Sequence, residues 1–135
     1  MKPLFLFLVF IVGIPIAHAG ELDGKGLICS AKKQKSFELG IIFKNEGVET
    51  LGVYDRIPLK ITRTKGTKLE VYTKKIWFFI RSLLYTIDRE ELTLHVGSDQ
   101  KYGWYDCKVS SPDQVIKFMN ERIDVLKASM KTNKL

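Results

Sequence analysis

The acidic run Asp88-Arg89-Glu90-Glu91 and the two histidines are the residues most able to support catalysis. Paired carboxylates serve as general acid and base in some hydrolases, and histidine does so near neutral pH. The acidic run lies between two alternating apolar segments, which predicts a solvated turn with ordinary carboxyl pKa values. His18 lies in a predicted leader, which leaves His95 without a second histidine for a metal pair. We therefore expect no enzymatic activity, metal or cofactor, with an enzyme based on the acidic run as an alternative.

The chain contains two cysteines, Cys29 and Cys107. Their spacing offers no metal site, and each shares strand parity with residues that we expect in the core. In an exported protein such a pair favours one intramolecular disulfide, with two separate buried thiols as the alternative. A disulfide would remove both sulfurs as nucleophiles.

A basic stretch from Arg56 to Lys75 is the best candidate for binding, because it holds seven cations against the single acid Glu70. Phosphates and sulfated or carboxylated sugars are ligands that such a stretch attracts. The alternative is a solvated face whose lysines discourage aggregation. The candidate anion-binding residues are Lys60, Arg63, Lys65, Lys68, Lys74 and Lys75. We expect Lys60 and Lys68 to point outward from two paired strands.

Among the aromatic residues in segments that read as strands, four invite interpretation as the lining of a ligand pocket, namely Trp77, Phe79, Trp104 and Tyr105. A small closed barrel can hold one small molecule among such rings. Aromatic residues at strand spacing are more often plain core. Both interpretations stay open at this point.

The elements that must position these residues are short strands joined by connections of two to five residues, which demand antiparallel neighbours. Apolar alternation or continuous apolar runs predict nine strands, at residues 27–33, 37–43, 48–54, 59–64, 68–73, 76–80, 84–87, 92–96 and 102–109. Residues 85–96 read as a hairpin. A meander of eight or nine strands is expected to curl into a small barrel or sandwich, because closure removes exposed edges.

The spacing of apolar residues changes from that of strands to that of a helix at Ser111-Pro112-Asp113-Gln114. This segment has the features of a helix start. Apolar residues then recur at helical spacing, so we expect an amphipathic C-terminal helix from about residue 112. The segment Ile76–Ile80 is apolar on both faces and needs a cover. We predict that the helix docks over Trp77 and Phe79, with Met119 against an aromatic ring.

The first 19 residues have the features of a cleaved signal peptide. Lys2 precedes the apolar run Leu4–Ile16, and Ala17-His18-Ala19 is a small-x-small cleavage signal. An uncleaved anchor is the alternative, although the run is shorter than the ~20 residues of a spanning helix. Residues 20–135 then form a single β-rich domain in the periplasm or outside the cell. The formal charge of +7 is moderately basic and attracts anionic surfaces.

Three short motifs, LICSA, YTIDREELTL and YDCKV, occur in that order over about residues 27–110. In this the chain resembles small exported bacterial proteins of unknown function. The resemblance implies a periplasmic or secreted β-domain and no known activity. More distantly, the layout of one disulfide and eight strands is similar to periplasmic inhibitors of C-type lysozyme. Their Ser-Gly-x-x-Tyr stretch is missing, and no inhibitor residues are carried across.

Two functional hypotheses follow from these patterns. The first is a non-catalytic exported binding or structural module that engages an anionic envelope component through the basic stretch. Its partner would be an anionic polymer, a membrane surface or a protein, and we expect no nucleic acid and a monomer. The alternative is a small-ligand carrier or inhibitor-type protein with a calycin-like barrel.

Overall fold

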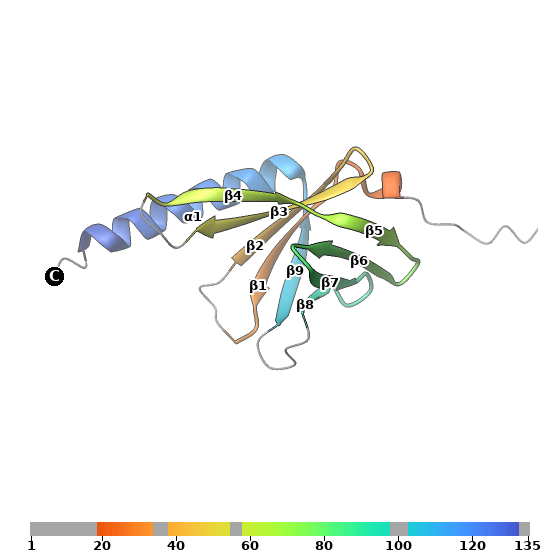
Figure 1. Ribbon diagram of the computed structural model, residues 1–135. Helices are drawn as coiled ribbons and strands as arrows, with labels where there is room; N and C mark the ends of the chain where they lie inside the picture. Colours follow the sequence, from red (N-terminus) through yellow and green to blue (C-terminus); the bar gives the residue numbers. More distant parts are fainter. Residues whose placement is uncertain (1–18, 34–37, 55–57, 98–102, 133–135) are drawn as a thin grey trace, which may run out of the picture.

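The computed structural model describes residues 19–33, 38–54, 58–97 and 103–132, where nine antiparallel strands form a nearly closed, barrel-shaped sheet (Figure 1). A short 3-10 helix precedes the strands and one α-helix follows them. The elements are η1 (Ala19–Leu22), β1 (Gly26–Ala31), β2 (Glu38–Lys44), β3 (Gly47–Tyr54), β4 (Lys60–Lys65), β5 (Thr67–Val71), β6 (Lys75–Ile80), β7 (Leu83–Asp88), β8 (Thr93–Val96), β9 (Trp104–Ser110) and α1 (Pro112–Thr132). The predicted mainly-β fold with a C-terminal helix is confirmed.

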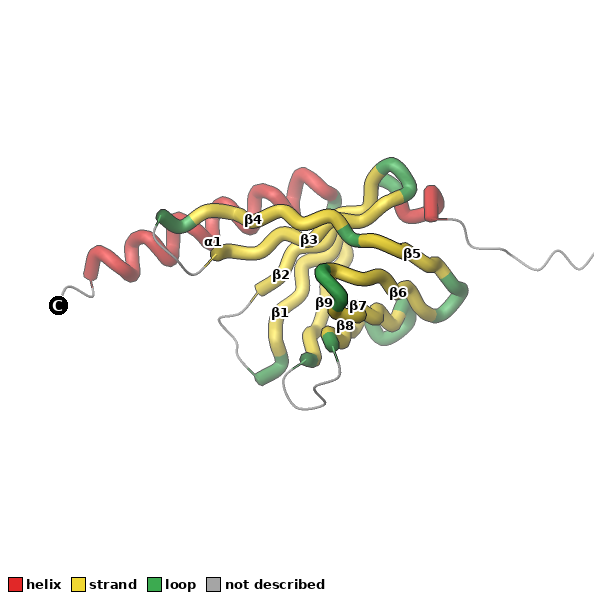
Figure 2. Tube along the Cα trace, viewed as in Figure 1, coloured by secondary structure: helices red, strands yellow, loops and turns green. Residues whose placement is uncertain are grey.

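The sheet curls until its two end strands meet. The strand order is β4-β3-β2-β1-β9-β8-β7-β6-β5, so β4 and β5 are the opposite ends of the sheet and yet follow one another in the chain. Figure 2 shows them joined end to end by a very short connection. At that connection the Gly66 amide donates to the Val48 carbonyl at 2.8 Å. One extended stretch therefore closes the barrel by pairing first with β3 and then with β6.

The prediction that Lys60 and Lys68 lie on paired strands is wrong, because β4 and β5 do not pair with each other. The predicted antiparallel meander requires a turn at Lys65-Gly66, between the strands predicted at residues 59–64 and 68–73, but these two residues continue the chain from β4 into β5. A side chain at position 66 would meet the core, since an added Cβ would lie 2.6 Å from Val48 Cγ1 and 3.1 Å from Phe78 Cδ2. Glycine lets the stretch cross close to the core at the point where its strand partner changes.

The barrel interior is filled by alternate residues of the strands. Phe78, Ile87 and Leu94 are fully or almost fully buried there. The predicted hairpin is present, since Ile87 faces Leu94 across β7 and β8. Leu22 of η1 joins this interior cluster, so the 3-10 helix covers part of it. The predicted signal peptide covers residues 1–19, of which residues 1–18 lie outside the described residues, as do Phe37 and Arg56.

The helix covers the outer face of β1 to β4, where it forms a second core with the strands (Figure 1). Val115 and Met119 are fully buried against Ile42 and Leu51. The prediction that α1 docks over Trp77 with Met119 against an aromatic ring is therefore wrong. The strand with both faces covered is β2, in which all of Gly40–Phe43 is buried.

The predicted helix start is confirmed in detail. The Ser111 hydroxyl accepts from the Gln114 amide at 3.2 Å, and the Gln114 side chain accepts from the Ser111 amide at 3.1 Å. This reciprocal pair is a capping box, and Pro112 takes the first helical position. Arg122 then places its Nε 3.6 Å from a Glu38 carboxylate oxygen on β2, which ties the middle of the helix to the sheet.

Candidate binding surface

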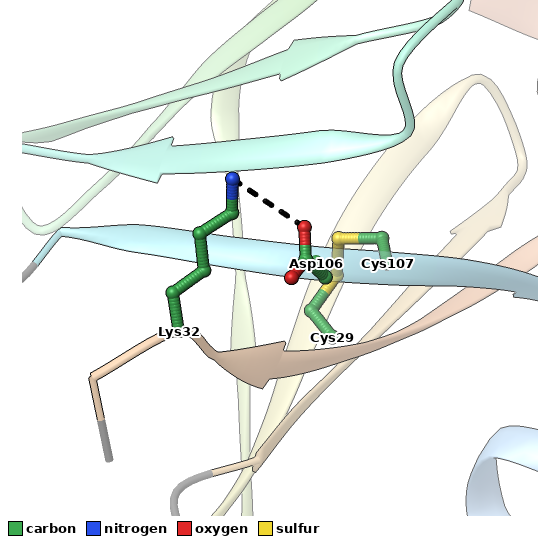
Figure 3. Close-up of a disulfide and its surroundings, with 4 residues drawn as sticks. All are labelled: Cys29, Lys32, Asp106 and Cys107. Atoms are coloured by element: carbon green, nitrogen blue, oxygen red, sulfur yellow. Dashed lines mark ion pairs between the residues drawn. A yellow bond between two sulfur atoms is a disulfide. The ribbon is translucent and has the colours of Figure 1, made fainter. Parts of the chain in front are cut away.

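The two cysteines form a disulfide inside the barrel (Figure 3). Cys29 and Cys107 are directly opposite residues on β1 and β9, with their Cα atoms 4.0 Å apart. Next to them, Lys32 and Asp106 form an ion pair of 3.5 Å on the outer side of the same strands. The predicted pairing is confirmed, and neither sulfur is free to act as a nucleophile.

The acidic run forms a structural turn between β7 and β8. Asp88 Oδ1 accepts hydrogen bonds from the backbone amides of Glu90 and Glu91, each at 2.9 Å. These two amides, first that of Glu91, together with the charges of Lys75 and Lys74, lower the pKa of Asp88 below its usual value. A carboxyl held ionised in this way is poorly suited to donate a proton as a general acid.

His95 lies on the outer face of β8, where its ring is 4.4 Å from that of Trp104, measured between centroids. It is half-buried by this contact. Within the described ranges, no group of three or more His, Cys, Asp or Glu residues is placed to hold a metal ion.

The structure divides the six predicted anion-binding residues between different surfaces. On β4, Arg63 and Lys65 share the outer face with Ile61, which packs near the helix, whereas Lys60 has the opposite parity. Arg63 is engaged in an ion pair with Glu49 of β3. The six cations therefore do not form the single stripe that the sequence indicated.

Lys68, Lys74 and Lys75 lie on the other half of the barrel, Lys68 near the start of β5 and the other two at the turn from β5 to β6. Lys68 lies at an irregularity in the pairing of β5 with β6 and has a positive φ of 54°. Its ammonium nitrogen lies 5.4 Å from the centroid of the Phe79 ring. Lys74 lies in the connection to β6, and Lys75 is the first residue of β6.

The connection that carries Lys74 is held in place by Arg89. The Arg89 side chain donates to the Tyr72 carbonyl at 2.7 Å, and its backbone amide donates to the Lys74 carbonyl at 2.9 Å. The same guanidinium pairs with Glu21 of η1 at 2.8 Å. The Tyr72 amide donates to the Lys75 carbonyl at 2.8 Å, which closes the hairpin between β5 and β6. The cations of this turn therefore stand on a fixed backbone.

An aromatic surface lies beside these lysines on the outer face of β5 to β9, and we call it the aromatic face. Its members point away from the interior because they alternate with buried residues of the same strands. They are Tyr72, Trp77, Phe79, Leu84, His95 and Trp104. Tyr72 is 49% exposed and Leu84 is 38% exposed, while the other four are half-buried.

The rings of the aromatic face support one another. Tyr72 stacks on Trp77 with centroids 6.4 Å apart, and Phe79 meets Trp77 edge-on at 6.0 Å. The expectation of a core or internal pocket holds for Tyr105, which is buried in the barrel, but not for Trp77, Phe79 and Trp104. The alternation of Trp77 and Phe79 with Ile76 and Phe78 places both rings outside, as the predicted helix contact over these rings assumed.

No protein-family model, curated protein or solved structure matches this chain. The site must therefore be interpreted from its own geometry. In the described part of the chain, no helix has the length and apolar character needed to cross a membrane.

Two open pockets lie on the outside of the barrel. One, of about 330 Å³, lies where β2 and β3 meet the Lys65-Gly66 connection. The other, of about 380 Å³, lies between the start of α1 and the end of β9, with Lys108 and Lys117 on its rim. Both are shallow surface features with mixed polar and apolar walls, and neither includes a residue of the aromatic face.

Proposed function

We propose that this chain is an exported, non-catalytic binding module that attaches to an anionic component of the cell envelope. The predicted signal peptide and the disulfide support export, because disulfides persist in oxidising compartments. The packed interior around Phe78 and Leu94 supports a surface site over the internal site of a carrier.

The observation that carries this proposal is the set of cations on β5 and the turn into β6. Lys68, Lys74 and Lys75 are all exposed, and none of them forms an ion pair with another described residue. Cations arranged on a fixed backbone attract a polyanion with little loss of main-chain entropy on binding.

The test must separate this surface from the overall positive charge. We would compare the triple variant Lys68→Gln, Lys74→Gln, Lys75→Gln with a triple variant of equal charge loss, Lys108→Gln, Lys117→Gln, Lys127→Gln. Salt elution from immobilised heparin is the measurement, because salt screens exposed charges. The first variant should elute at clearly lower salt than the wild type, and the second should shift much less. Equal shifts of the two variants would show that net charge alone explains retention.

A further inference from the structure

The helix leaves half of the barrel's outer surface without a cover. It packs on β1 to β4, whereas the aromatic face lies on β5 to β9 (Figure 1). Clustered rings on the outside of a small domain mark a place where something binds, because monomers seldom expose such patches. The chemistry of the neighbouring side chains decides what that ligand is.

Rings and polar groups share one row of cross-strand neighbours on this surface. From β5 to β9 the row reads Glu70, Trp77, Thr86, His95, Trp104. Adjacent strands lie ~4.8 Å apart, so the three steps from Trp77 to Trp104 span about 14 Å. The row therefore matches an extended ligand with several repeating units.

Neighbouring side chains fix the orientation of the rings on this surface. Trp77 is held between Tyr72 and Phe79, and Trp104 lies against His95. The Tyr72 hydroxyl donates to Glu70 at 3.1 Å, which fixes the outermost ring. The centre of a protein interface is depleted of charged residues, and a bilayer-binding surface presents an apolar face, whereas this row places Glu70 and Thr86 beside Trp77.

Sugars have the matching chemistry. The C–H faces of a pyranose pack on aromatic rings, and its hydroxyls bond to groups such as Thr86 and His95. Lys68, Lys74 and Lys75 border the same surface, which favours a chain that carries carboxylates or sulfates.

We propose that the aromatic face binds an acidic polysaccharide laid across strands β5 to β9, with sugar rings on Trp77 and Trp104 and acid groups at Lys68, Lys74 and Lys75. This inference rests on the proposed anion-binding function and names its ligand class and binding surface.

The two tryptophans of the chain both belong to this face, so the wild-type protein carries its own probe. Polygalacturonate, a carboxylated glycan, should shift the tryptophan emission and protect it from quenching by acrylamide. Dextran, a neutral glycan, should bind at least about tenfold more weakly because it lacks partners for the lysines.

A variant that keeps every charge tests the role of the rings. Tyr72→Ala removes an exposed ring and should weaken polygalacturonate binding about tenfold, since stacking contributes strongly in comparable sites. The control Val125→Ser with Met130→Ser removes exposed apolar surface from the helix, where these residues are 57% and 45% exposed. This control should bind as the wild type does, and thermal melts of all variants confirm folding.

The outcomes separate the two proposals. In one outcome, polygalacturonate binding depends on the lysines but does not protect the tryptophans from acrylamide, and Tyr72→Ala binds as tightly as the wild type. This result would overturn the role of the aromatic face and keep the anion-binding function. Failure to bind any polyanion would overturn both. Stronger, tyrosine-dependent binding to vesicles of phosphatidylglycerol and phosphatidylcholine than to polygalacturonate would assign the face to a lipid surface and overturn the polysaccharide.

Discussion

A side chain at position 40 would collide with Val115, because a Cβ built on Gly40 would lie 2.6 Å from Val115 Cγ1. The same Cβ would also lie 3.3 Å from Leu51 Cβ. The missing side chain is therefore what lets the start of α1 sit directly on β2. Gly26 makes similar room on β1, with an added Cβ 2.7 Å from Val115 Cγ2.

Replacing Gly40 with alanine should destabilise the protein by about 1–3 kcal/mol, because overpacking forces the helix or the strand to move. Urea unfolding measures the change. Val115→Ala in the same chain should recover part of the loss, since it removes the group in conflict. Gly52→Ala is the matched control, because nothing lies within 4 Å of an added Cβ there. Equal losses at Gly40 and Gly52 would contradict the close contact.

Met119 and Met130 lie on the same helix in opposite environments, fully buried and 45% exposed respectively. Met119→Ala should lower the free energy of unfolding by about 2–5 kcal/mol through lost burial and a cavity. Met130→Ala should change it by less than about 0.5 kcal/mol. The tryptophan emission of folded Met119→Ala should match the wild type, because the second core contains neither tryptophan. A large emission shift would argue that the helix also covers Trp77.

Loss of the disulfide should weaken the fold strongly, because Cys29 and Cys107 are 78 residues apart in sequence. The chain-entropy model gives about 4–5 kcal/mol for closing a loop of this size. Thermal unfolding of Cys29→Ala with Cys107→Ala measures the effect without adding reductant. A melting temperature equal to that of the wild type would show that packing around β1 and β9 suffices.

Two tyrosines that pack on the barrel interior, the buried Tyr105 and the half-buried Tyr85, predict a loss of stability at alkaline pH. Burial raises the pKa of Tyr85. The pKa of Tyr105 is raised mainly by burial and, to a smaller extent, by the charge of nearby Tyr85. As the pH rises, the unfolded chain releases these protons before the folded protein does. The contribution of the two tyrosines to the free energy of unfolding is therefore complete below a pH of about 10 and is lost as the pH rises further.

Tyr85→Phe keeps the ring that stacks on Phe78 and removes the ionisable group. Its melting temperature should fall less steeply than that of the wild type between about pH 9 and pH 11. Parallel profiles of the two proteins would show that Tyr85 does not contribute to the alkaline transition.

Local sequence patterns were sufficient to predict most elements and several contacts. Alternation in residues 85–96 predicted the hairpin, and Ser111 with Gln114 predicted the helix start. The shared parity of Cys29 and Cys107 with core residues predicted their meeting. These features depend on backbone periodicity and on neighbours a few residues away, or on there being a single way to pair two cysteines.

The tertiary structure decided which strand the helix covers and which residues share a surface. Ile76–Ile80 and Gly40–Phe43 are both apolar on two faces, and periodicity alone does not choose between them. The helix sits on β2 because Gly26 and Gly40 allow Val115 to approach, whereas Trp77 and Phe79 would hold it away. The closure of the barrel through Gly66 then placed Lys68 beside Phe79 and separated it from Lys60, because β4 and β5 pair with different strands. Such choices depend on the fit of side chains brought together from distant parts of the chain, which no local pattern records.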